Sequence, residues 1–143
     1  MFKKFFTKEA KKATNDNNIL VAAMLVHAAK IDDNYTDAEK NIIKRALSNL
    51  YSIAPNQAEK LLIEAEKKEQ ESNQILEFTK EIKKKPMEFR LKVIEILWEI
   101  VYSDSTSDSF ESNLIRRVCG LLYVSDKDSG MIKLKVKNLV KQK

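Results

Sequence analysis

The chain has 143 residues, and 43% of them are hydrophobic, so it can bury a core without disulfide bonds. Its single cysteine cannot form an internal disulfide, and its longest apolar run, Ile19 to Val26, is too short to cross a bilayer. The net charge is +5, but the lysines are scattered among 21 acidic residues, and arginine, which base readout prefers, is rare. These features predict one cytoplasmic domain and disfavour a nucleic-acid partner.

The spacing of apolar residues predicts an all-α fold, because only two glycines and two prolines are available for turns. We expect a basic and aromatic N-terminal segment over residues 1–16 and a compact bundle of about seven helices over residues 17–143. The expected helices cover, in chain order, residues 17–31, a stretch after Thr36, a stretch that begins at Pro55, residues 73–84, a stretch after Pro86 that ends near residue 103, residues 109–123, and a stretch after Ser125.

Two of these helices, over residues 17–31 and between Pro86 and residue 103, are apolar on nearly every side, which predicts a central, buried position for both. Residues 132–137 alternate with period two and could be interpreted as a strand. The helical spacing of the apolar residues there favours a helix, because the chain offers no second strand to pair with it.

An internal repeat relates two helix pairs. A shift of 72 residues aligns Leu25 with Leu97 and Ile43 with Ile115, and it aligns the first two predicted helices with the fifth and sixth. Each pair consists of a buried helix, a short acidic loop and an amphipathic helix. Two such units would most simply pack with approximate two-fold symmetry.

The repeat includes four carboxylates, because the same shift aligns Asp32 with Asp104 and Glu39 with Glu111. One interpretation is structural: Thr36 and Glu39 form a capping box, and Glu111 follows Asp108 with the same spacing. Capping explains the glutamates but leaves both aspartates at the end of the preceding helix, where the helix dipole disfavours negative charge.

The other interpretation is a site for a hard divalent cation, calcium or magnesium, which prefers carboxylate and carbonyl oxygens from a loop. Neither loop is an EF-hand, because Asp37 and Ser109 stand where that motif requires glycine, and Ile43 and Ile115 stand where it requires the closing glutamate. Zinc is disfavoured, because the chain has one histidine and one core-facing cysteine. The residues alone leave capping and cation binding open.

Two potentially reactive residues have structural interpretations. Cys119 aligns with Leu47 on a core-facing stripe, so it is predicted to be a small buried hydrophobe rather than a nucleophile. His27 aligns with Glu99 on a nearly apolar helix, which predicts a partnered interior histidine rather than a base or a ligand. Since the sequence also contains no glycine-rich phosphate loop and no paired base and nucleophile, we expect a protein that is not an enzyme.

The segments LVHAAKIDDNYTDAE (25–39) and LWEIVYSDSTSDSFESNLIRRVCGLLYVSDKD (97–128) resemble the TerB-like family, which is associated with tellurite resistance and stress response. The resemblance covers about residues 17–140 and implies a compact fold of about seven helices. It also implies a cytoplasmic partner of membrane-associated components, and related domains occur fused to a membrane-anchored J-domain co-chaperone. The resemblance further implies divalent metal binding through the matching acidic positions, Asp32, Glu39, Asp104 and Glu111.

The first acidic motif departs from the family at the residue after its aspartate, where the family usually has glycine and this chain has Asp33. The second motif has Ser105 at the same place. If this position needs a positive φ at the end of a helix, aspartate tolerates it moderately and serine poorly.

The N-terminal segment places Phe2, Phe5 and Phe6 on one helical face, surrounded by lysines. This pattern is typical of a peripheral membrane contact, but a single short turn binds lipid weakly. A terminal turn that is frayed or packs on the domain is therefore favoured, and both interpretations stay open.

The sequence as a whole predicts a non-enzymatic TerB-like domain that binds a protein partner, with calcium or magnesium as the candidate cofactor at the acidic loops. Two alternatives remain. One is a purely structural helical adaptor whose acidic residues only cap helices, and the other is a lysine-driven nucleic-acid binder, whose affinity would fall steeply with salt.

Overall fold

The computed structural model describes residues 18–31, 35–72, 75–103 and 109–141, without the side chains of residues 109–112, 140 and 141. Within these ranges the chain forms seven helices and no strand, which confirms the all-α prediction and the helical interpretation of residues 132–137. The first helix covers residues 18–29. The others are α2 (Asp37–Tyr51), α3 (Pro55–Glu71), α4 (Ile75–Ile82), α5 (Met87–Ser103), α6 (Ser109–Leu121) and α7 (Asp126–Lys141).

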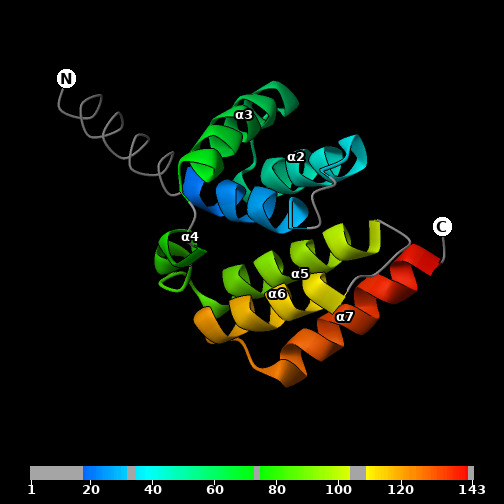
Figure 1. The fold of residues 1–143 in the computed structure, drawn as a ribbon. Helices are drawn as coiled ribbons and strands as arrows, with labels where there is room; N and C mark the ends of the chain where they lie inside the picture. The colour runs from blue at the N-terminus through cyan, green and yellow to red at the C-terminus, as the bar shows by residue number, and fades with distance from the viewer. Residues whose placement is uncertain (1–17, 32–34, 73–74, 104–108, 142–143) are drawn as a thin grey trace.

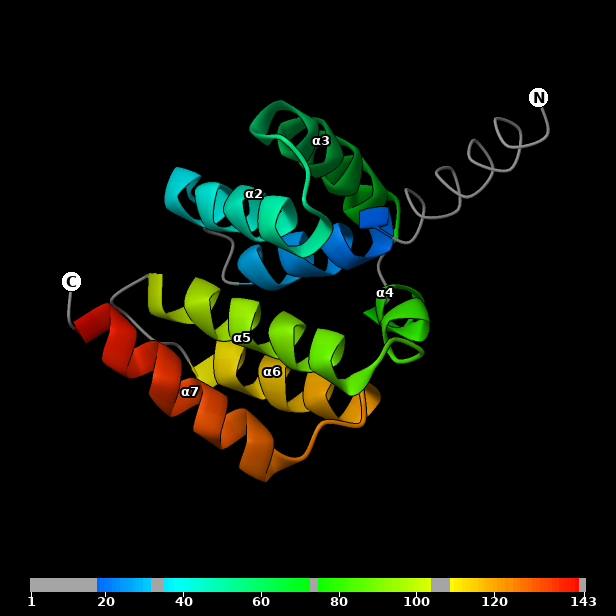
Figure 2. The ribbon, with the colours of Figure 1, turned by 180° about the vertical axis from the view of Figure 1, so that it is seen from behind.

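The helices form two groups that face each other (Figure 1). The first helix, α2 and α3 make up one group, and α5, α6 and α7 make up the other. The same two groups are seen from the opposite side (Figure 2). The groups meet where α2 packs on α5, and α4 packs against α6 at one end of the molecule. No helix in the described ranges is both long enough and apolar enough to cross a membrane.

The core is built around the first helix and α5, the two helices that the sequence predicts to be central. Both are buried on most sides, because apolar residues occupy nearly all of their turns. The buried residues of α5 are Val93, Ile94, Ile96, Leu97, Trp98, Ile100 and Val101.

The burial pattern follows the internal repeat. Every buried residue of α5 aligns, through the 72-residue shift, with a buried residue of the first helix. In the amphipathic helices, Ile43 and Leu47 of α2 align with Ile115 and Cys119 of α6, and all four are buried. The two halves therefore share their core positions, and the repeat predicted from the sequence is confirmed at the level of burial.

The correspondence has exceptions, and Ala23 is one of them. Ala23 of the first helix is fully buried, whereas Glu95, its counterpart in α5, is only half-buried. The same face of the two helices therefore has different surroundings in the two halves.

Candidate functional site at the first acidic junction

The four carboxylates predicted as metal ligands differ in how much of them the structure describes. Asp32 and Asp104 lie outside the described residues, as do Asp33 and Ser105. Glu111 belongs to α6, but its side chain also lies outside the described part of the chain. Glu39, in the first turn of α2, is the one motif carboxylate whose surroundings can be given.

Glu39 forms the predicted capping box with Thr36. The backbone N–H of Glu39 donates to Thr36 Oγ1 at 3.1 Å, and the backbone N–H of Thr36 donates to Glu39 Oε1 at 2.8 Å. The Thr36 hydroxyl also donates to Glu39 Oε1, at 3.1 Å. Glu39 is only 2% exposed, so this carboxylate is a buried part of the junction and not a surface cap.

Helix α3 brings further carboxylates to the same junction. Burial, followed by the negative charges of Glu66, Glu39 and Glu69, raises the pKa of the Tyr35 hydroxyl well above its usual value. Lys40 of α2 lies across this group, with its Nζ 4.9 Å from the centre of the Tyr35 ring and 3.9 Å from Glu66 Oε2. The junction thus combines three carboxylates with a phenol that stays protonated at neutral pH.

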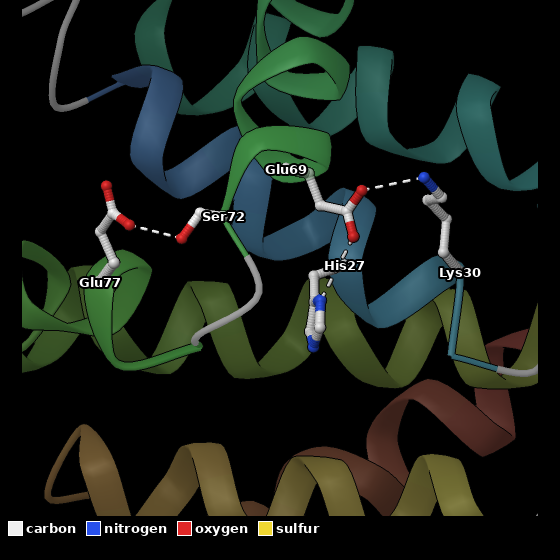
Figure 3. Close-up of polar contacts among 5 residues, drawn as sticks. All are labelled: His27, Lys30, Glu69, Ser72 and Glu77. Carbon is white, nitrogen blue, oxygen red and sulfur yellow. Dashed lines mark hydrogen bonds and ion pairs between the residues drawn. The ribbon is translucent and has the colours of Figure 1, made fainter.

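Glu69 connects α3 to the first helix (Figure 3). Its Oε2 accepts a hydrogen bond from Lys30 Nζ at 2.9 Å, and its Oε1 lies 3.4 Å from His27 Nδ1. The His27 ring also contacts the Phe78 ring of α4, with centroids 6.2 Å apart. The prediction that His27 is a partnered histidine is confirmed, although 28% of its side chain is exposed.

Glu66 and Glu69 are not among the site residues predicted from the sequence. Their signal was present, because Leu62, Glu66 and Glu69 have the i, i+4, i+7 spacing of one helical face, so the carboxylates extend the buried stripe of α3. Charged residues that continue an apolar stripe point to a polar contact within the fold. Which side chains these carboxylates contact is seen only in the structure, where α3 packs on the first helix.

The described geometry favours charge compensation over catalysis at this junction. Glu69 is paired with two basic side chains, and Glu39 accepts hydrogen bonds from Thr36. Elsewhere, Cys119 is buried as predicted. Among the described residues, no group of three or more histidine, cysteine, aspartate or glutamate side chains could hold a metal ion. A cation site at the junctions would therefore need the aspartates that lie outside the described ranges.

The comparisons with known proteins identify one family. The family model described as "Tellurite resistance protein TerB" matches residues 18–134, which is most of the chain. No curated protein and no solved structure matched the chain.

Proposed function

Because the chain belongs to the TerB family of tellurite resistance proteins, we propose that it acts as a non-enzymatic interaction domain whose acidic junctions bind a divalent cation. The observation that carries this proposal is the burial of Glu39 at the first junction. A buried carboxylate is costly unless hydrogen bonds or positive charge compensate for it. Thr36 already donates hydrogen bonds to Glu39 Oε1, and a calcium or magnesium ion would add positive charge at the same junction, because both prefer carboxylate oxygens.

The residues that would hold the cation are Asp32 and Glu39 at the first junction and Asp104 and Glu111 at the second. A bound cation would neutralise their charge and fix each loop against the helix that follows. A partner protein would then recognise the ordered junction. The domain itself would make and break no covalent bond.

Calorimetric titration of the full chain with calcium and, separately, magnesium tests the cation. We expect heat of binding and a rise in melting temperature, because a ligand at a hundred times its Kd stabilises the folded state by about 2.7 kcal/mol. The double variant Asp32→Asn/Asp104→Asn should abolish both effects. Asp128→Asn is the matched control, since Asp128 is an acid in the first turn of α7, away from both motifs.

The alternative to a cation site is a structural adaptor, and the capping box favours it. Thr36 and Glu39 satisfy each other's backbone N–H groups without a metal, so capping alone accounts for this glutamate. No heat and no change in melting temperature at millimolar metal would leave the adaptor as the function. Metal binding that survives in the double variant would instead place the site elsewhere in the chain.

A further inference from the structure

The internal repeat makes one face of the first helix equivalent to one face of α5. Leu20, Ala23 and His27 have the i, i+3, i+7 spacing of a helical face, and the 72-residue shift aligns them with Lys92, Glu95 and Glu99. The two faces thus occupy the same register positions in the two repeats. Their chemistry differs, because the first is mostly apolar and the second is charged.

Helix α4 covers the face on the first helix. Its Phe78 ring lies against His27, with centroids 6.2 Å apart, and Leu20 lines a hollow together with Lys80 and Glu81 of α4. The buried side of α4 consists of Ile75, Phe78, Thr79 and Ile82, so α4 is a short amphipathic helix that rests on this part of the fold.

Glu77 holds α4 in place through polar contacts with the end of α3. It accepts a hydrogen bond from the Ser72 hydroxyl (Figure 3) and lies 3.1 Å from Lys68 Nζ. These two contacts lower the pKa of the Glu77 carboxyl below its usual value. Together with the buried Ile75, Phe78 and Ile82, they make α4 an integral part of the fold.

The equivalent face of α5 is partly exposed, because Lys92 is exposed and Glu95 and Glu99 are half-buried. It borders a cleft of about 240 Å³ between α2 and α5, whose aliphatic lining includes the half-buried Leu50 and the buried Ala46 and Ile96. Charged residues of both signs complete the lining: Arg45 from α2, and Lys92, Glu95 and Glu99 from α5. Glu95 also pairs with Lys135 of α7, at 3.2 Å.

From this correspondence we infer that the cleft between α2 and α5 binds a short amphipathic helix of a partner protein, as α4 covers the equivalent face of the first helix. The aliphatic part of the cleft takes the apolar side of that helix. Arg45 and Lys92, whose side chains are exposed, pair with acidic residues of the partner. This inference rests on the proposed role as an interaction domain and is independent of the cation.

The difference between the two faces explains why one cover is fixed and the other is exchangeable. An apolar face such as that of Leu20 and Ala23 is more stable when covered, because the exposure of apolar surface to water costs free energy. A face with Lys92, Glu95 and Glu99 is soluble when empty, so its partner can leave. Charged residues around an apolar surface also give a partner its orientation and specificity.

The peptide of residues 72–86 is a suitable probe, because it contains α4 and carries charges of both signs beside its apolar face. Added at up to millimolar concentration to the isotope-labelled full chain, it should shift the backbone amide signals of Ala46, Leu50 and Ile96. The same peptide with Phe78→Asp should not. A short helical peptide is only marginally ordered in water, so weak binding with fast exchange is expected.

Variants of the cleft separate docking from nonspecific binding. Arg45→Glu combined with Lys92→Glu should weaken peptide binding at least tenfold, because it places negative charge opposite the acidic residues of the peptide. Lys44→Glu, on the same helix but outside the lining of this cleft, should leave binding unchanged. Both variants alter partly or fully exposed side chains, so both should fold.

Three results would overturn the inference. The first is the absence of signal shifts at millimolar peptide. The second is a set of shifts centred on Leu20 and His27, which would mean that the peptide exchanges with α4 itself. The third is a set of shifts that depends on protein concentration without peptide, which would mean that a second copy of the chain occupies the cleft. A chain that binds a cation but not the peptide would refute this inference and retain the proposed function.

Discussion

Cys119 shows how the repeat predicts the environment of a single residue. It aligns with Leu47, and the structure buries both, with exposed fractions of 1% and 0%. Burial raises the pKa of the Cys119 thiol, and a contact with the Ser129 hydroxyl offsets part of that rise. The thiolate is the reactive form of cysteine, so a buried thiol with a raised pKa has low reactivity.

We therefore expect Cys119 to resist modification in the folded chain. At pH 8, a thiol reagent such as DTNB should react with the native protein far more slowly than with the same protein in denaturant. The rate of release of the coloured thiolate measures this directly. Equal rates in the two conditions would show that Cys119 is accessible and that the repeat misplaces it.

At the scale of the helix, short polar motifs fix where α2 and α7 begin. Thr36 caps α2 in a reciprocal capping box, and Ser125 caps α7 by accepting the backbone N–H of Asp128 at 3.1 Å. The sequence predicts the Thr36 cap and a helix that begins after Ser125, because capping depends on residues only three apart. The two caps differ in burial, because Glu39, which pairs with Thr36, is buried, whereas Ser125 is exposed.

This difference predicts unequal costs for removing the two caps. Thr36→Ala should lower the free energy of unfolding by about 2 kcal/mol, the upper end for a lost N-cap, because it also takes a hydrogen bond from a buried carboxylate. Ser125→Ala should cost about 1 kcal/mol or less. Urea denaturation followed by circular dichroism measures both, and a larger loss for Ser125→Ala would contradict the assignment.

At the scale of the whole molecule, the repeat places matching residues in matching parts of the core. Leu25 of the first helix and Leu97 of α5 are 0% and 1% exposed and are aligned by the 72-residue shift. Each lies in the middle of a helix that the rest of the fold encloses. The two halves should therefore contribute to stability through equivalent sites.

We expect Leu25→Ala and Leu97→Ala to destabilise the chain by similar amounts, each about 2–5 kcal/mol, through lost burial and the cavity left behind. Leu134→Ala is the control and should change stability by less than about 0.5 kcal/mol, because Leu134 is 60% exposed. Denaturant midpoints of the three variants test this. A loss confined to one of the two core variants would mean that one half dominates the core.

The sequence alone determined the helices, their caps, the repeat and the burial of Cys119. Each of these follows from residues close in the chain or from a pattern that recurs at a fixed shift, so spacing and side-chain chemistry suffice. The acidic motif is also visible in the sequence, and the structure adds that the Glu39 carboxylate of this motif is buried. Cation binding by Asp32, Glu39, Asp104 and Glu111 stays a prediction.

Only the tertiary structure decided which residues surround the motif and which face of the bundle is open. Glu69 meets His27 across 42 residues of sequence, and α4 covers one of two equivalent faces while the other borders a cleft. Apolar periodicity shows that a helix has a buried side, but not which helix lies against it. That choice depends on how distant segments pack together, and here it places carboxylates of α3 beside Tyr35 and a cleft between α2 and α5.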